Sequence, residues 1–410
     1  MTGVQTCALP IFYIENSSVA VSNRFGLGGA KTGAATVKFS SQDNHLLFGL
    51  ADCKNFTNDV ALVIDQTGSS NVAVLGSQAQ DETFVQNADI TFKVGTTYAK
   101  RFAYVNNIEF ISGTFASSGH LYMYGNLYSS LKVGPGCVVV RNGGTAPCNL
   151  AFYGAGYNVG MSAVPAVTLA PSSFSGFATI VNEITQLRLD APDVFDACPG
   201  VKINYGEARV AQLGRGVVDL CGRDQTIGRF FPWTTVARET SNPQYGVVTS
   251  SAPAVVTQTT DETGLFRDAL LFTGAAGYCY AGAGTNLLCN VKSTSLGDFR
   301  VSSGVAGYDW GAAWGGTNIV VDGAGVLYVG AESAPAFGDR TEAKASGVAL
   351  HVNDGGKLFL EGGETFVCAA TRGGETVPRG EWSASNCDWI DGGGVLHVLR
   401  DGTGLTIIFR

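Results

Sequence analysis

Short strand-like runs separated by turn residues repeat along the whole chain, and this pattern constrains the fold more than any other feature. Val, Ile, Leu and aromatic residues alternate with polar ones, and clusters of Gly, Asn, Asp and Ser separate the runs, as expected for β-strands bounded by turns. The nearest candidate for a helix, 181–195, is interrupted by Pro192. We therefore predict an all-β fold. The clearest predicted strands are 61–65, 71–75, 90–94, 120–124, 137–141 and 319–322.

Internal similarity indicates that these strands belong to repeated units. A strand–turn–strand pattern at 180–220 recurs at 319–360. An Asp-Gly pair also precedes several strand-like runs, where the Asp can close a turn on its own backbone and the Gly supplies a positive φ. Units of this kind bury their apolar faces by stacking, so we predict a parallel β-solenoid with roughly 20 to 25 residues in each coil. The Asp-Gly pairs begin at Asp322, Asp354, Asp391 and Asp401.

The composition supports a packed core and excludes several functional classes. Hydrophobic residues make up 45% of the 410 residues and there are only 12 prolines, which is too apolar for a disordered chain. Charged residues, at 15%, are fewer than the ~25% of an average protein, and 55 residues are Gly. The net charge of −8 provides no basic surface for nucleic acid. The sequence also contains no apolar run of about 20 residues that would form a transmembrane helix.

The first eleven residues, 1–11, match the translation of a common short-read sequencing adapter read from a GTG start codon. The alternative is a signal peptide, but the apolar stretch at 8–12 is short, follows no basic residues and precedes no small-residue cleavage site. We therefore exclude 1–11 as non-native and expect the true N-terminus to be missing. The rest of the chain divides into an N-terminal solenoid part, 12–176, and a repeat region, 177–410.

The cysteines do not follow a metal-binding pattern. Outside the adapter-like segment none lies in a C-x-x-C pair, and the chain has four His, so we predict no metal site. Neighbours in sequence could form disulfides in an oxidising compartment. The alternative is buried free thiols, which behave as small apolar core residues, and the odd number of cysteines favours some of these. The candidate pairs are Cys137 with Cys148, Cys279 with Cys289, and Cys368 with Cys387.

Several short motifs carry a resemblance to a known family. Gly-Gly-x-Leu-x-[Leu/Val] elements occur at 355–360 and 393–398, a Gly-Ala-Gly-Thr element at 282–288, and Val-Asp-Leu-Cys-Gly-Arg-Asp-Gln-Thr-Ile at 218–227. Together they resemble the repeats of bacterial autotransporter-associated β-strand repeat proteins, over about 177–410. The resemblance implies a right-handed parallel β-helix, secretion or display on the outer cell surface, and an adhesive role. It implies no catalytic residues and no cofactor.

An enzymatic alternative follows from the same predicted fold, because right-handed β-helices also include polysaccharide lyases and glycoside hydrolases. Hydrolysis requires two carboxylates on either side of the scissile bond. Asp190, Asp193 and Asp196 lie within one short turn-like segment and are the candidate acidic cluster, either for catalysis or for Ca²⁺. Their simpler interpretation is a solvated loop. The sequence has no G-x-S-x-G nucleophile motif, and the Gly-rich segment 25–32 lacks two glycines of a Walker loop.

Aromatic residues suggest a third possibility, glycan binding, because exposed aromatic faces stack on sugar rings. Tyr308, Trp310 and Trp314 are clustered in a Gly-rich segment, and core packing is the alternative for them. From the sequence we predict a non-catalytic, monomeric, secreted or surface β-helix passenger with a structural or adhesive role, whose partners are glycans or a host or cell surface. A polysaccharide-active β-helix enzyme is the alternative function.

Overall fold

Strands make up most of the structure, a computed structural model, and this confirms the predicted all-β class. The structure describes residues 11–14, 23–25, 34–39, 46–48, 56–58, 61–66, 73–76, 83–94, 100–105, 107–125, 130–142, 148–154, 166–181, 185–196, 198–203, 216–231 and 245–401. Within these ranges there is one α-helix, α1 (Arg340–Ser346), and no helix is long and apolar enough to cross a membrane. Nearly all of the adapter-like segment, 1–10, lies outside the described residues.

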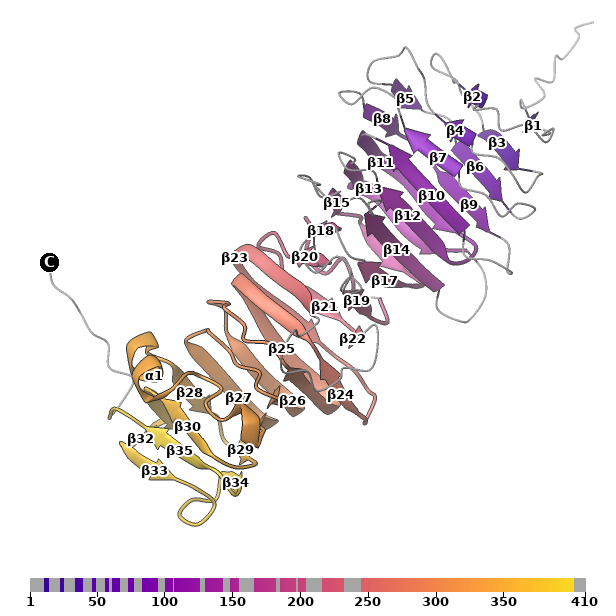
Figure 1. Ribbon diagram of the computed structural model, residues 1–410. Helices are drawn as coiled ribbons and strands as arrows, with labels where there is room; N and C mark the ends of the chain where they lie inside the picture. Colours follow the sequence, from indigo (N-terminus) through magenta and orange to yellow (C-terminus); the bar gives the residue numbers. More distant parts are fainter. Residues whose placement is uncertain are drawn as a thin grey trace, which may run out of the picture. The chain divides into compact units, whose positions relative to one another are not determined.

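The chain forms two compact units (Figure 1). The first comprises residues 1–199 and 206–216, and the second comprises residues 200–205 and 217–410. The predicted division after residue 176 rests on sequence motifs alone and stays a prediction.

Two sets of parallel strands form the first unit, and in Figure 1 the strands of each set lie side by side. One set consists of β1 (Ile11–Ile14), β3 (Ala34–Phe39), β5 (Phe56–Asn58), β6 (Ala61–Gln66), β8 (Thr83–Gln86), β9 (Ile90–Val94), β11 (Asn107–Ser117), β13 (Ser130–Arg141), β15 (Ala166–Leu169), β16 (Ser173–Ser175) and β18 (Gln186–Leu189). The other consists of β2 (Asn23–Phe25), β4 (Leu46–Phe48), β7 (Ala73–Gly76), β10 (Lys100–Val105), β12 (Leu121–Gly125), β14 (Cys148–Gly154) and β17 (Phe177–Val181).

The core of the first unit is a ladder of apolar side chains from successive strands. Ile108 lies opposite Leu131 and Leu131 lies opposite Val167, in the next paired strand each time. All three side chains are buried, because alternate residues of a strand point to the same face of the sheet. The same alternation is visible in the sequence, and the predicted strands at 61–65, 71–75, 90–94, 120–124 and 137–141 are confirmed as β6, β7, β9, β12 and β13.

The second unit contains a main sheet and two smaller groups of strands. The main sheet consists of β20 (Val217–Asp219), β21 (Gln225–Ile227), β23 (Gly246–Gln258), β24 (Leu265–Asp268), β25 (Leu270–Cys289), β26 (Phe299–Asp309), β27 (Asn318–Val329), β28 (Ala349–Val352), β29 (Lys357–Leu360), β31 (Ala369–Arg372), β32 (Glu375–Val377) and β34 (Ile390–Gly392). The smaller groups are β19 (Val201–Ile203) with β22 (Phe230–Phe231), and β30 (Glu364–Val367) with β35 (Val395–Val398) and β33 (Gly380–Trp382).

Parallel pairing between successive strands characterises the second unit. Among the described strands of this unit, only β31–β32 and β33–β35 pair antiparallel. Thr285 lies opposite Val305, twenty residues later, and Phe299 lies opposite Ile319 at the same interval. Parallel neighbours require a crossover connection rather than a tight hairpin, and the interval between paired residues rises to 31 where Ile319 lies opposite Leu350.

Aromatic rings fill the interior of this unit. The Phe299 ring centroid lies 4.8 Å from that of Tyr308 and 5.3 Å from that of Trp314. Phe272 contacts Trp314 at the same centroid distance, 5.3 Å. These side chains are at most 2% exposed, and such tilted contacts between rings add to the free energy gained from burial.

One of the predicted Asp-Gly turns is wrong. Gly355 and Gly392 adopt the expected positive φ, of 86° and 96°. Asp322, by contrast, lies inside the continuous strand β27. Its carboxylate accepts hydrogen bonds from Arg300 Nε (2.7 Å) and Ser302 Oγ (2.9 Å) of the neighbouring β26. These partners from another strand replace the turn on its own backbone that the local sequence suggested.

Helix α1 was not predicted, although the sequence contains its signals. Asp339 accepts hydrogen bonds from the backbone N–H groups of Thr341 and Glu342, and the Glu342 side chain accepts one from the Asp339 N–H. Gly347 ends the helix in the left-handed conformation, with φ 73°. This capping box followed by a C-terminal Gly marks a helix of only two turns, which is too short to show an apolar stripe.

Candidate functional site

Five strands of the second unit bring outward-facing residues together. In register across β24, β25, β26, β27 and β29 lie Arg267, Leu287, Gly307, Tyr328 and Phe359. Asp309 lies two residues after Gly307, and Glu361 lies two residues after Phe359. Both point to the same side as these residues, because side chains alternate along a strand. Trp310 directly follows Asp309. We call Arg267, Asp309, Trp310, Tyr328, Phe359 and Glu361 the Trp310 face.

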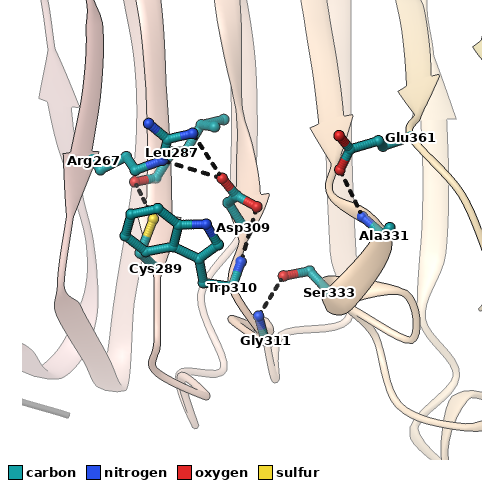
Figure 2. Close-up of polar contacts among 9 residues, drawn as sticks. All are labelled: Arg267, Leu287, Cys289, Asp309, Trp310, Gly311, Ala331, Ser333 and Glu361. Carbon is teal, nitrogen blue, oxygen red and sulfur yellow. Dashed lines mark hydrogen bonds and ion pairs between the residues drawn. The ribbon is translucent and has the colours of Figure 1, made fainter. Parts of the chain in front are cut away.

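Arg267 connects the acidic and aromatic parts of this face (Figure 2). Its Nε and Nη2 both donate to Asp309 Oδ2, at 3.2 and 3.1 Å. Its guanidinium carbon lies 4.6 Å from the centre of the Trp310 ring, a cation–π contact. The Arg267 side chain is 32% exposed and that of Asp309 is 9% exposed. This partly buried ion pair therefore fixes the guanidinium against the indole.

Hydrogen bonds to the backbone hold Trp310 in a conformation that is unusual for its residue type. Trp310 has a left-handed φ of 51°, which costs a residue other than Gly roughly 1–2 kcal/mol. Its N–H donates to Asp309 Oδ1 at 2.9 Å, and the next N–H, of Gly311, donates to Ser333 Oγ at 3.0 Å. The ring remains half-buried. These contacts orient an indole that is in part accessible to solvent.

Tyr328 and Phe359 form a second aromatic element. Their rings are stacked, with centroids 5.5 Å apart and planes 6° apart, and Phe359 is 36% exposed. Nearby, Glu361 Oε2 accepts the Ala331 N–H at 3.0 Å. Burial, with the nearby charge of Asp309, raises the pKa of Tyr328 to about 12. The hydroxyl is therefore protonated at neutral pH and can donate a hydrogen bond.

Cys289 lies beside the ion pair and is not a reactive thiol. Its side chain is fully buried, and its Sγ donates to the Leu287 carbonyl at 3.6 Å (Figure 2). Burial, followed by the charge of Asp309, raises the pKa of the Cys289 thiol. A thiol with a raised pKa contains little thiolate, which is the nucleophilic form.

The three aromatic residues predicted from the sequence differ in their environments. Tyr308 is fully buried, and Trp314 is 2% exposed and donates from Nε1 to the Gly297 carbonyl at 3.0 Å. Neither presents a ring face to solvent, so the alternative interpretation, core packing, describes both. Trp310 alone of the three retains a half-buried ring.

The predicted acidic residues lie on an exposed turn of the first unit. Asp190, Asp193 and Asp196 are all exposed, and the Asp196 N–H donates to the Asp193 carbonyl at 3.2 Å. No basic side chain among the described residues forms an ion pair with Asp190 or Asp196. Asp190 and Asp196 therefore lack, among the described residues, the basic partner that a lyase site would require.

The cysteines do not form the suggested pairs within the part of the chain that the structure describes. The eight described cysteines are free, and six of them are buried, which matches the buried-thiol alternative. Across the same residues, no group of three or more His, Cys, Asp or Glu side chains is placed to hold a metal ion.

Sequence reasoning missed most of the Trp310 face. Arg267 and Asp309 are 42 residues apart in the chain, and they meet only because Arg267 pairs with Leu287 while Cys289 pairs with Asp309. This register cannot be read from a single sequence. The one local signal was the Asp309-Trp310 dipeptide within the Gly-rich segment.

The Trp310 face combines partly exposed aromatic rings with oriented carboxylates and a neutralised cation, and both carboxylates are already occupied by hydrogen bonds. Such an arrangement suits the binding of a polar ligand with apolar faces rather than acid–base or nucleophilic chemistry. Comparison of the chain with protein families, with curated proteins and with solved structures finds no match.

Proposed function

We propose that the chain is a right-handed β-helix that acts as a non-catalytic, glycan-binding surface protein. Support for the helical coil comes from the parallel pairs in which a strand meets its neighbour about 20 residues later, as Thr285 meets Val305, or about 30 residues later, as Ile319 meets Leu350. Such stepwise pairing along the chain is the arrangement expected of stacked coils. An experimental structure would contradict the right-handed β-helix if its crossover connections were left-handed. It would also contradict it if successive strands did not form successive coils.

Display outside the cell is part of the same proposal and rests on the repeat-like motifs at 218–227, 282–288, 355–360 and 393–398. The protein would then act as an adhesive passenger. Protease added to intact cells that produce the protein should degrade it, whereas a cytoplasmic marker in the same cells should survive. Protection of both would argue against export.

One observation carries the binding function: Trp310 is held half-buried with its indole oriented by Arg267 and Asp309. A sugar ring offers C–H groups on its faces and hydroxyls at its edge. The partly exposed rings of Trp310 and Phe359 match the faces, and the exposed carboxylate of Glu361 can accept hydrogen bonds from hydroxyls. Holding these groups in place before binding reduces the entropy lost when a ligand is captured.

A glycan array followed by titration of the best hit tests this function, using Trp310→Ala and a matched control, Trp382→Ala. Trp382 is also half-buried and donates from Nε1 to the Pro378 carbonyl at 3.0 Å, but it lies on β33, outside the face. We expect Trp310→Ala to weaken binding at least about tenfold, as removal of an aromatic anchor does, and Trp382→Ala to leave it unchanged. Equal affinity in all three proteins would overturn the proposal.

A polysaccharide-active enzyme is the alternative, and the spacing of two carboxylates on the same face favours considering it. Asp309 and Glu361 are two strand steps apart, or about 10 Å between backbones, near the separation of about 6.5–9.5 Å found in inverting glycosidases. Asp309 is however already paired with Arg267. A reducing-end assay on the glycans that bind decides between the two functions. If the wild type produces new reducing ends and Glu361→Gln does not, the protein is a hydrolase rather than an adhesive passenger.

A further inference from the structure

We infer that the Trp310 face selects uncharged glycans and excludes acidic ones, because Asp309 already neutralises the cation beside Trp310. This inference rests on the proposed glycan-binding function and names the class of ligand.

Arg267 has no unpaired charge available to an anionic ligand. Both Nε and Nη2 donate to a single oxygen, Asp309 Oδ2, and the Asp309 side chain is 9% exposed. A uronate or sulfate that captured the guanidinium would have to displace Asp309. The displaced carboxylate would remain nearly buried without a counter-ion, which is strongly unfavourable.

The other cations on the strands of this face are also paired. Along β24 to β29 the basic residues other than His are Arg267, Arg300 and Lys357. Arg300 Nε contacts Asp322 Oδ2 at 2.7 Å, and Lys357 Nζ contacts Asp391 Oδ2 at 3.1 Å. Each cation on these strands therefore has a carboxylate partner.

Glu361 leaves the face with a net negative charge. Its carboxylate accepts a hydrogen bond from a neutral donor, the Ala331 N–H, and it forms no ion pair with any described basic residue. An anionic sugar that extends along the face meets this charge, and the one cation of the face, Arg267, is already paired. A neutral sugar meets only hydrogen-bonding groups and ring faces.

Two consequences distinguish this ligand class from an acidic one. Binding of a neutral glycan should change little with ionic strength, because salt screens charge–charge attraction but not stacking or neutral hydrogen bonds. Release of Arg267 from its partner should, in contrast, create affinity for acidic glycans, since guanidinium binds carboxylates well.

The test uses Asp309→Asn, which removes the charge but keeps an amide oxygen that can accept the Trp310 N–H. The probes are glucose hexamers, cellohexaose and maltohexaose, and the hexamer of galacturonic acid, titrated at 20 mM and at about 300 mM NaCl so that screening differs strongly. We expect the wild type to bind a glucose hexamer at least about tenfold more tightly than the galacturonate hexamer. We expect Asp309→Asn to gain affinity for the galacturonate hexamer by a similar factor, in a salt-sensitive manner.

Glu109→Gln is the matched control. Glu109 is paired with Lys132 at 2.6 Å on strands β11 and β13 of the first unit, so this variant makes the same change in net charge and also frees a cation. It should not gain affinity for the galacturonate hexamer. If it gains as much as Asp309→Asn, net charge rather than Arg267 determines selection, and the inference fails.

The remaining outcomes distinguish failure of the inferred ligand class from failure of the proposed glycan-binding function. If the wild type binds the galacturonate hexamer in a salt-sensitive manner and Trp310→Ala loses this binding, the inference is overturned but the glycan-binding function is not. Absence of any Trp310-dependent binding, to the array or to these hexamers, would overturn both. If Asp309→Asn does not fold, the preference of the wild type between the two hexamers and its salt dependence still decide the inference.

Discussion

Arg267 and Asp268 are consecutive residues of β24, yet their side chains occupy opposite environments. Arg267 faces outward over Trp310, whereas Asp268 points into the core and is 2% exposed. Neither carboxylate oxygen of Asp268 receives a hydrogen bond of good geometry from the residues that the structure describes. The nearby Asn286 amide nitrogen donates instead to the Tyr278 hydroxyl, at 3.0 Å.

The environment of Asp268 makes stability depend on pH. Burial raises the pKa of Asp268 from 3.8 to about 7, although Asn286 and the charge of Arg229 act in the opposite direction. The folded protein thus binds a proton more tightly than the unfolded chain does. Stability from this group is fully present below pH 3.8 and is lost progressively as the pH rises to about 7.

We therefore expect Asp268→Asn to be more stable than the wild type at pH 8, by up to several kcal/mol at roughly 1.4 kcal/mol per pKa unit. The difference should shrink towards zero as the pH approaches 4. Urea denaturation from pH 4 to pH 8 measures it, with Asp261→Asn as a control on an exposed carboxylate. A constant difference between variant and wild type across this range would mean that Asp268 does not titrate within it.

The strands themselves could be predicted from sequence because their signal is local. Val63 lies between buried Leu62 and Ile64 in β6. This alternation of buried and less buried positions can be read directly from the sequence. The pairing of strands is not local. Phe299 meets Ile319, and Ile319 meets Leu350 across a connection that contains helix α1, so the interval between neighbours changes where a segment is inserted.

Gly307 lies where neighbouring strands approach closely, and no sequence motif predicted this requirement for glycine. In register it lies between Leu287 and Tyr328, and a Cβ atom at Gly307 would collide with the backbone oxygen of Tyr328. Backbone cannot move aside as the end of a flexible side chain can. Close approach of neighbouring strands therefore excludes any larger residue at this position.

We expect Gly307→Ala to destabilise the second unit by about 1–3 kcal/mol, the usual cost of overpacking, and to weaken glycan binding by displacing Tyr328. The control is Gly362→Ala, because a Cβ there meets only the Ala331 Cβ at an ordinary 3.5 Å. Thermal unfolding and titration of the glycan measure both effects. Equal melting temperatures for the two variants would show that the strands around Gly307 can separate without cost.

The candidate site was predictable only where its residues are adjacent in sequence. The Gly-rich segment drew attention to Trp310, but it could not distinguish the half-buried Trp310 from the buried Trp314, four residues later. The difference arises from the backbone, since the left-handed φ of Trp310 turns the chain, and Trp314 then packs between Phe272 and Phe299. Arg267, from β24, completes the face through strand register alone.

Substitution of the two tryptophans should separate these roles. Trp314→Ala removes a ring that is 2% exposed, two aromatic contacts and the hydrogen bond to the Gly297 carbonyl, and it should cost roughly 3–5 kcal/mol. Trp310→Ala removes a half-buried ring and relieves part of a strained φ if the backbone relaxes, so its effect on stability should be much smaller. Chemical denaturation of both variants measures the free energy of unfolding, and titration with the glycan measures binding. A large loss of stability in Trp310→Ala, with no separate loss of binding, would mean that Trp310 is a core residue like Trp314 and that the face has no ligand.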